Sequence, residues 1–481
     1  MEFTEELHRF RARVGARRVP ALIIPGSGQA QTAALLIGAL EPQRVAFLLT
    51  PDSAQMPTQV AQLLGLWHEG WRPEELRWAC HAEDHTRTLQ IYRSLRTIIR
   101  AWEDLPHREI AVDVTGGTKP MSVGLAKAAY MLAIEALYIE SDFTPPDSGG
   151  RRQLIPGSQR LAPPPDPYVV FGHLEAAEAA RLFAAHDYAG AEGIFAVLAR
   201  RLQHALAEES GLAAEDPTLA AEVELLAANY AASARLATAY AHWDSFDLPT
   251  AQEALRAYLL AAPPTGDRAR LLQAQRDDLA RLATVTSRAG GKGRDALATL
   301  ADPDAVLPLL GALYANARRR EAQGRYDTAA LLCYRCLELC SQHRLAGWDV
   351  LTERPELREL LRRRPRLEEA YRNVEEQVGF EPRGLPRPGR NGRLSPIALF
   401  GGYMLLAALG DPLVEGFDIE QIRARAELRN KSILAHGYRL ITHAEYAQFA
   451  ALVEELLDRL FAVLGRERAA WTARSTFLPL E

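Results

Sequence analysis

The segment from Asp113 to Lys119, which reads DVTGGTK, is suited to holding an anionic ligand. Gly116 and Gly117 carry no Cβ atom, so the backbone can approach a ligand closely at these positions. Pro120 follows, and proline is tolerated in the first turn of a helix, where N–H groups lack helical partners. N–H groups at such a helix start would point toward phosphate oxygens, and the ammonium group of Lys119 would add a point charge. The sequence therefore predicts an anion-binding turn here.

A second group of residues has side chains that could transfer a proton and hold a phosphate. Arg429, Asn430 and His436 lie close together, and His436 directly precedes Gly437, a residue type that commonly ends helices. RNA carries its own nucleophile, the 2′-hydroxyl, so an enzyme needs to move a proton and to stabilise the charge that builds on the phosphate. A histidine can transfer a proton near neutral pH, and the planar fork of an arginine can hold a phosphate. The structural alternative is an exposed ion-pairing arginine and a histidine at a helix end.

The elements around the first motif predict a parallel α/β domain. Glu109–Val114 is a short apolar run typical of a buried strand, Pro120–Ala133 is expected to form a helix, and Ala136–Ile139 is expected to form the next strand. Earlier, the apolar runs Ala21–Ile24 and Val45–Leu49 are separated by a helical segment. This alternation predicts a doubly wound parallel sheet.

Three turns, at 25–28, 50–53 and 115–119, follow strands of this predicted sheet. In such sheets ligands bind beyond the carboxyl ends of the strands, so we expect the three turns to converge on one crevice. The predicted ligand contacts are Gly26, Ser27, Gly28, Thr50, Thr115, Gly116, Gly117, Thr118 and Lys119. The alternative is an ordinary Gly-Gly connection, since no GxxxxGK[ST] spacing precedes Lys119 and no GxGxxG fingerprint follows the first strand.

Composition divides the chain into three predicted domains, and the fold class is α/β followed by all-α. Residues 1–167 form the α/β domain, whose end is marked by the proline-, glycine- and arginine-rich stretch 144–167. Residues 168–300 have helical spacing and predict a helical connector, and residues 301–481 predict a second helical domain. Within it, the loop 381–396 is rich in proline and glycine and is either solvated or follows an RNA backbone. Its arginines are Arg383, Arg387, Arg390 and Arg393.

A helix predicted at 418–438 sets the expected geometry of the second motif. Arg429 and His436, seven residues apart, would project from one face of that helix. Their separation along the axis would be about 10 Å, which is awkward for a single chain acting on one phosphate. Two copies facing each other across a two-fold axis could bring these groups together, so we expect a homodimer.

Composition indicates a globular protein and excludes several classes. The 481 residues are 48% hydrophobic and carry a net charge of −5, which argues against a chain that coats nucleic acid indiscriminately. We find no signal peptide and no membrane span, and four cysteines make no disulfide framework, so a cytoplasmic location is expected. No metal and no cofactor is expected. Cys333, Cys336 and Cys340 are read as buried apolar residues, and His81 or His85 as possible ligand contacts.

Both motifs resemble known families. The DVTGGTK turn resembles the signature turn of CARF domains, the CRISPR-associated Rossmann-fold sensors of cyclic oligoadenylates. Arg429, Asn430 and His436 resemble the R-x(4–6)-H motif of HEPN ribonuclease domains, with a gap of six. The order of the motifs resembles the CARF–HEPN effector ribonucleases of type III CRISPR systems. That resemblance implies an allosteric activator, cyclic oligoadenylate, bound across a CARF dimer. It also implies metal-independent cleavage of single-stranded RNA by a HEPN dimer, with 2′,3′-cyclic phosphate ends.

Two other functions fit the same residues. The HEPN domain could bind RNA or a partner without cleaving, which would make the protein a ligand-sensing scaffold. Alternatively, the CARF domain could itself degrade the cyclic activator, with Ser27, Thr115 and Lys119 orienting a ribose hydroxyl. RNA cleavage assays separate the first of these from an effector ribonuclease.

Overall fold

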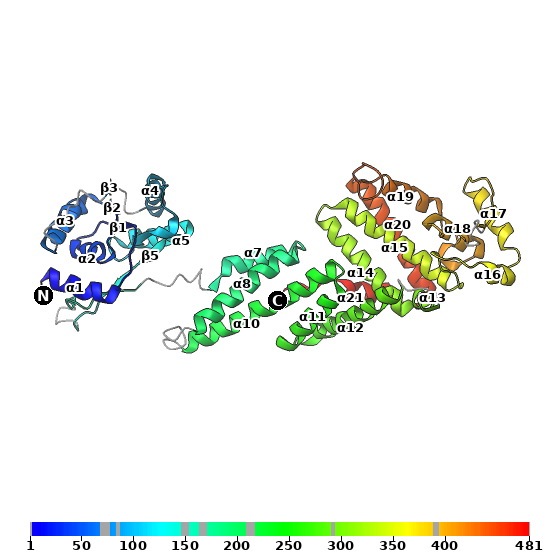
Figure 1. Ribbon diagram of the computed structural model, residues 1–481, viewed down its shortest axis with the longest axis horizontal. Helices are drawn as coiled ribbons and strands as arrows, with labels where there is room; N and C mark the ends of the chain where they lie inside the picture. Colours follow the sequence, from blue (N-terminus) through cyan, green and yellow to red (C-terminus); the bar gives the residue numbers. More distant parts are fainter. Residues whose placement is uncertain are drawn as a thin grey trace. The chain divides into compact units, whose positions relative to one another are not determined.

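The computed structural model describes residues 2–67, 77–82, 87–145, 153–162, 171–207, 217–289, 294–387 and 394–480 (Figure 1). The chain divides into two compact units, Met1–Val169 and Val170–Glu481. The second unit contains both the predicted connector and the predicted C-terminal domain. The predicted boundaries at 167 and 300 therefore stay a proposal about how the chain divides further.

The first unit is built around a parallel sheet of five strands. These are β1 (Ala21–Pro25), β2 (Arg44–Leu49), β3 (Arg77–Ala82), β4 (Ile110–Asp113) and β5 (Glu135–Leu137). Their order across the sheet is β3-β2-β1-β4-β5, and every pairing is parallel. In the central strand β1, Leu22 lies opposite Val45 of β2 on one side and Ala111 of β4 on the other. The predicted doubly wound sheet is confirmed.

Helices cover both faces of this sheet because its strands are apolar on both sides. Leu22 and Ile24 pack against helices α1 (Phe3–Val14), α2 (Ala30–Leu40) and α3 (Met56–Trp67). Ala21 and Ile23, which alternate with them, pack against α4 (Thr88–Ala101) and α5 (Lys119–Leu132) on the opposite face. Packing in these two apolar layers holds the strands in place, and with them the carboxyl end of β4, from which the DVTGGTK turn begins.

The stretch that the sequence marks as the end of this domain returns to it instead. Strand β7 (Arg160–Leu161) pairs antiparallel with β6 (Ile139–Glu140). The carboxylate of Glu6, which is buried in α1, accepts hydrogen bonds from the side chain of Gln159 and the backbone N–H of Gly157. The described part of this stretch is therefore anchored to the first unit, and its composition alone did not predict this.

The second unit is helical and has two apolar cores. The first core is formed by α7 (His173–Ala184), α8 (Tyr188–Ala207), α10 (Pro217–Asp244), α11 (Leu248–Ala261) and α12 (Gly266–Ala289). The second core is formed by α14 (Pro303–Ala322), α15 (Tyr326–Ala346), α16 (Arg358–Arg363), α17 (Leu367–Gln377), α18 (Leu399–Leu409), α19 (Glu420–Asn430) and α20 (His443–Val463). The structure also describes α13 (Arg294–Ala301) and α21 (Arg468–Ser475).

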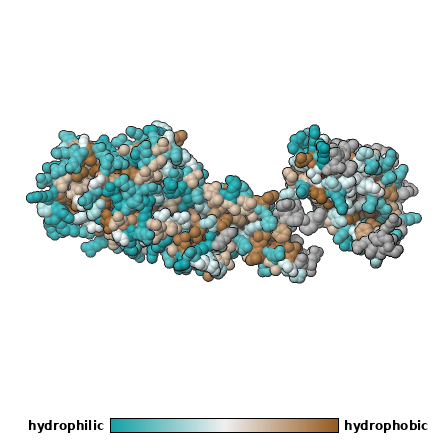
Figure 2. All heavy atoms as spheres, turned by 180° about the vertical axis from the view of Figure 1, so that it is seen from behind, coloured by the Kyte–Doolittle hydropathy of each residue, from teal (hydrophilic) through white to brown (hydrophobic). Residues whose placement is uncertain are grey.

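The surface of the second unit is mixed. Figure 2 shows hydrophobic surface over the helices in the middle of the chain, next to hydrophilic areas. Exposed apolar side chains there are Leu174, Val197, Leu225 and Leu260. Within the described ranges, no single helix is long and apolar enough to cross a membrane, although the pair α13 and α14, bent by 71°, meets that criterion together.

Cys333, Cys336 and Cys340 are buried in the second core, as predicted. Burial raises the pKa of Cys333 and of Cys340 to about 12, so both thiols are protonated and behave as small apolar side chains. Among the residues that the structure describes, no group of three or more His, Cys, Asp or Glu side chains is arranged so that it could hold a metal ion.

Candidate functional sites

The first candidate site lies where the strand order of the sheet reverses. Strands β1 and β4 are neighbours, and the chain continues from β1 to one side of the sheet and from β4 to the other. Crevices at such a reversal, beyond the carboxyl ends of the strands, are where doubly wound sheets bind ligands. The turn after β1 and the DVTGGTK turn after β4 flank this point.

The three predicted turns converge, and glycines allow them to do so. A Cβ atom added to Gly26 would lie 2.1 Å from Oγ of Ser53, which follows β2. One added to Gly116 would lie 3.3 Å from Cβ and Oγ of Ser27, which follows β1. Gly117 has a φ of +84°, and its added Cβ would lie 3.0 Å from Cβ of Pro25. Close approach and a left-handed backbone therefore explain why glycine occupies these positions.

Asp113, at the end of β4, holds the turn from below. Its side chain is 2% exposed and accepts a hydrogen bond of 2.9 Å from the backbone N–H of Thr115. Burial raises the pKa of Asp113 above its ordinary value, while hydrogen bonds from Thr115 and Gly116 oppose that rise. The hydroxyl of Thr115 accepts the N–H of Ile139 at 2.7 Å. Asp113 and Thr115 therefore fix the turn through contacts within the first unit.

The turn leads directly into the start of α5. Thr118 is the residue before the helix, Lys119 is its first residue, and the Lys119 side chain is exposed. Among the described residues, no carboxylate forms an ion pair with Lys119. The hydroxyl of Ser122 donates to the carbonyl of Gly116 at 2.9 Å and so ties the turn to the helix. A helix start with an exposed ammonium group beside it has the charge and the N–H donors that suit an anion. The sequence motif did not single out Ser122.

Two predicted contacts have structural roles. Gly26 is buried, and Thr50 is buried at the end of β2. The hydroxyl oxygens of Thr50 and Ser53 lie 3.1 Å apart, and the Thr50 N–H donates to Oγ of Ser53 at 2.8 Å. In the described state these residues support the turns, whereas Gly28 is exposed with nothing within 4 Å of an added Cβ. Contact of Gly26 and Thr50 with a ligand stays a prediction. His85 lies outside the described residues, as does the side chain of His81.

The second candidate site departs from its predicted geometry. The helix expected at 418–438 is wrong at its end, because α19 stops at Asn430. Ser432 is 2% exposed, and its N–H donates to the carbonyl of Arg429 at 3.0 Å, which tightens the last turn. Ser432 also forms an isolated parallel bridge with Arg439. His436 is therefore not on the helix, and Gly437 does not end it.

The chain after α19 folds back on the helix end. The backbone N–H of His436 donates to the carbonyl of Asn430 at 3.3 Å, and the N–H of Gly437 donates to the carbonyl of Ser432 at 3.2 Å. His436 is exposed, and Arg429, seven residues earlier in the sequence, is partly buried. The folded turn brings the backbone of His436 next to Asn430 within one chain. The expected 10 Å separation along a helix, and the argument for a dimer that it supported, no longer hold.

Arg429 is held by an aromatic ring that the sequence did not point to. Its guanidinium carbon lies 4.7 Å from the ring centre of Tyr334 in α15, and Nη1 donates to Oδ1 of Asn430 at 3.1 Å. Burial and the neighbouring Glu338 raise the pKa of Tyr334, so the ring stays neutral at ordinary pH. The face of a neutral ring attracts the cation, and Arg429 is thereby oriented without a carboxylate partner.

The basic loop 381–396 lies partly outside the described residues, since 388–393 are not described. Of the four arginines predicted to follow an RNA backbone, the structure describes Arg383 and Arg387. The backbone N–H groups of Arg383 and Gly384 donate to Oε2 of Glu375 at 2.9 Å and 2.7 Å. This carboxylate anchors the start of the loop. The proposed role of the loop in RNA binding stays a prediction.

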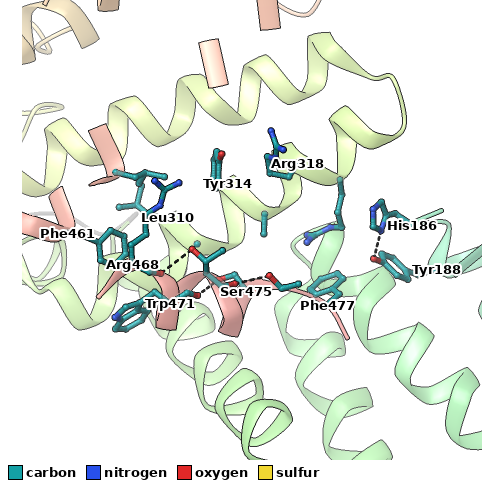
Figure 3. A pocket seen from close by; sticks show the side chains of 16 residues that line it. His186, Tyr188, Leu310, Tyr314, Arg318, Phe461, Arg468, Trp471, Ser475 and Phe477 are labelled. Carbon is teal, nitrogen blue, oxygen red and sulfur yellow. Dashed lines mark hydrogen bonds between the residues drawn. The ribbon is translucent and has the colours of Figure 1, made fainter. Parts of the chain in front are cut away.

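A separate cavity of about 240 Å³ lies in the second unit (Figure 3). In Figure 3, Tyr314 of α14, Trp471 of α21 and Phe477 of the C-terminal segment surround it. Its three arginines each pair with a carboxylate; the pairs are Arg318–Glu321, Arg319–Asp244 and Arg468–Asp458. Because these charges are already neutralised, the cavity does not resemble a phosphate site.

Comparisons with known proteins cover both halves of the chain. Residues 299–460 match the family model of the Csm6 HEPN domain. The CRISPR system endoribonuclease Csm6 of Thermus thermophilus is 25% identical over 453 residues, which is 91% of this chain and 84% of that protein. The solved structure of Enterococcus italicus Csm6 bound to cyclic hexa-2′-fluoro-hexa-dAMP is 12% identical, covers 96% of this chain and 98% of its own, and gives a TM-score of 0.42. Can2 from Sulfobacillus thermosulfidooxidans in complex with cyclic tetra-adenylate is 13% identical, covers 52% of this chain and 71% of its own, and gives a TM-score of 0.21. The HEPN match includes Arg429, Asn430 and His436.

Proposed function

We propose that this chain, a CARF–HEPN effector of CRISPR systems, is an endonuclease of single-stranded RNA that cyclic oligoadenylate activates. One observation carries the proposal. The turn after α19 brings the backbone of His436 to that of Asn430, the neighbour of Arg429, inside the segment that matches the Csm6 HEPN domain. This chain is 25% identical to a Csm6 endoribonuclease over 91% of its length, and that relationship supports the same activity.

The chemistry of cleavage follows from the types of these residues. The guanidinium of Arg429 holds the scissile phosphate and stabilises the charge that builds on it, while His436 transfers a proton. The 2′-hydroxyl of the RNA gives up its proton as its oxygen attacks the phosphorus, the bond from phosphorus to the 5′-oxygen breaks, and the leaving oxygen takes up a proton, so one proton is lost and one is gained overall. The products are a 2′,3′-cyclic phosphate and a 5′-hydroxyl end. Because the nucleophile belongs to the substrate, this route does not require a metal ion.

The crevice of the first unit is proposed to bind the activator. Phosphate oxygens of the cyclic oligoadenylate would meet the start of α5 and the ammonium group of Lys119. Gly116 and Gly117 leave room for that approach, because a side chain at either position would meet Ser27 or Pro25. Ser27, Gly28, Thr115 and Thr118 complete the proposed contacts, with Gly26 and Thr50 supporting them from below.

A homodimer is proposed on new grounds. The turn after α19 carries four exposed apolar side chains, and a folded chain rarely leaves such a cluster in water without a partner. They are Ile433 (53% exposed), Leu434 (47%), Tyr438 (95%) and Leu440 (65%). A cyclic ligand with internal two-fold symmetry fits a two-fold dimer, in which one patch pairs with its copy. The partner that covers this surface is therefore a second copy of the chain.

Activation requires that the ligand bind the cleaving arrangement more tightly than the resting one. A nearly complete switch needs about 5 kcal/mol of differential affinity. Several phosphate contacts, made in two copies across a dimer, can supply this amount, because each charge-assisted hydrogen bond contributes roughly 1.5–3 kcal/mol.

The test is cleavage of a labelled single-stranded RNA by the purified full chain. Cyclic tri-, tetra- and hexa-adenylate are added in turn, each with and without EDTA, and the product ends are identified by mass spectrometry. We expect one ring size to activate cleavage, EDTA to have no effect, and cyclic phosphate ends to form. RNA binding without cleavage at every ring size would identify a scaffold and overturn the proposal. A strict requirement for added divalent metal would overturn the mechanism.

A further inference from the structure

The helix that precedes the cleavage turn carries three arginines with different surroundings. Arg423 pairs with Glu427, with Nε 3.4 Å from the carboxylate. Arg425 and Arg429 form no ion pair with a described residue. Many arginines of the second unit do have a carboxylate partner, so these two require an explanation of their own.

Both side chains also have an unsatisfied buried donor. The Nε atoms of Arg425 and Arg429 are buried and have no hydrogen-bond partner. Buried donors in folded proteins normally have partners, so each exception requires an explanation. The helix end explains a cation at Arg429, because the C-terminus of a helix is negative. It does not explain Arg425, which lies a full turn earlier.

Arg425 and Arg429 are four residues apart, so they lie on the same side of α19 and about 6 Å apart along its axis. Both are partly buried at the edge of the face on which Ile422 is buried. α19 packs here against α15, which supplies the ring of Tyr334. Two cations at this spacing repel each other when nothing lies between them. An anion that spans both would remove that repulsion.

The spacing and the charge fit two successive phosphates of one RNA strand. We propose that Arg425 is a substrate-binding residue, which holds the phosphate next to the scissile phosphate held by Arg429. This inference rests on the proposed RNA cleavage and deepens it. Arg425 makes no contact with the reacting atoms; it fixes the position of the strand, so that the bond to be cleaved lies at Arg429 and His436.

The test compares Arg425→Gln with Arg423→Gln as a matched control. Both changes remove one arginine from the same helix, but only Arg423 is ion-paired. A phosphate contact contributes in ground and transition states alike, so Arg425→Gln should raise KM for RNA about ten- to a hundredfold and leave kcat within about twofold. Arg423→Gln should leave both parameters close to the parental values.

The salt dependence of RNA binding distinguishes a phosphate contact from a purely structural role, because only the loss of a phosphate contact changes it. The binding of an uncleavable 2′-O-methyl RNA is measured against salt concentration for the parental chain and both variants, with activator present. The loss of one phosphate contact should reduce the slope of log K against log salt by about 0.7 for Arg425→Gln and leave it unchanged for Arg423→Gln. Thermal unfolding of each variant checks that the fold is intact.

The outcomes separate this inference from the proposed function. If the parental chain cleaves RNA while Arg425→Gln keeps the parental KM and salt slope, the inference is overturned and the function stands. If Arg425→Gln lowers kcat at an unchanged KM and salt slope, Arg425 supports the site without contacting RNA, and the inference is again overturned. If the parental chain neither cleaves nor binds RNA, both fail.

Discussion

Gly437 allows the turn after α19 to fold back, and replacing it tests the geometry of the cleavage site. A Cβ atom at this position would lie 2.0 Å from the carbonyl oxygen of Lys431 and 2.4 Å from its carbonyl carbon. Real Cβ atoms essentially never approach a neighbour closer than 3.0 Å, and the neighbour here is backbone, which cannot rotate away. In Gly437→Ala the two segments must therefore separate by about 1 Å.

The size of the effect follows from this displacement. The hydrogen bond from His436 to Asn430 is already 3.3 Å long, so a shift of that size breaks it and moves His436. A misplacement of about 1 Å in a catalytic group costs about a hundredfold in rate, which corresponds to about 2.7 kcal/mol. Stability should fall by only about 1–2 kcal/mol, since a few exposed turn hydrogen bonds are lost.

The assay measures kcat for RNA cleavage at saturating activator, together with urea unfolding. Gly193→Ala is the matched control, because an added Cβ there meets nothing within 4 Å and the residue lies inside α8. It should keep the parental kcat and gain about 0.5–1 kcal/mol of stability. If Gly437→Ala cleaves RNA at the parental rate, the folded turn is not the active arrangement and the reasoning fails.

Three further predictions concern the sensor, the proton transfer and stability. Lys119→Ala should weaken binding of the cyclic activator about ten- to a hundredfold, as measured by calorimetry. Lys127 is exposed on the same helix, so Lys127→Ala should bind the activator as the parental chain does. If both variants bind the activator with equal affinity, Lys119 does not contact it. His436→Ala should abolish cleavage and keep activator affinity; cleavage at the parental rate would refute its role. Burial lowers the pKa of His343, whose Nδ1 lies 2.7 Å from the carbonyl oxygen of Leu300. Its contribution to stability is thus present above the unfolded pKa of about 6.5 and lost as pH falls through the folded pKa. Urea unfolding at pH 7.5 and 5.5 should show this loss in the parental chain and a smaller loss in His343→Gln.

The parts of the fold that the sequence predicted correctly depend on local pattern. Continuous apolar runs such as Ala21–Ile24 indicate strands buried on both faces, and the structure extends this one only to Pro25. Turns after such strands must lie at one edge of a parallel sheet, so the convergence at Gly26, Ser53 and Gly116 followed from topology.

The parts that the sequence did not predict depend on contacts between distant residues. Nothing in the local sequence after Asn430 prevents a helix, yet α19 ends there because Ser432 is buried and bridges to Arg439. The ring of Tyr334 meets Arg429 from another helix, and no spacing pattern reveals that contact. Tertiary packing thus determined where the helix ends and how the arginine is held, although the residue types that could do the chemistry were visible in the sequence.

Because His436 lies in a turn and not on the helix, the proposed dimer rests on the exposed apolar side chains of that turn. Tyr438 gives the sharpest test of this interface. Its side chain is 95% exposed, two residues after His436, so folding of one chain leaves a large aromatic ring in water. Burying such a ring contributes about 1.5–3 kcal/mol, and in a two-fold interface each substitution acts twice. Tyr438→Asp should therefore weaken dimerisation at least a hundredfold, as measured by sedimentation. Its cleavage rate per chain should be low in dilute protein and recover at high protein concentration. Leu260→Asp is the control, because Leu260 is 71% exposed on α11, outside this turn. A Tyr438→Asp chain that stays dimeric and active at every concentration would show that the dimer uses another surface.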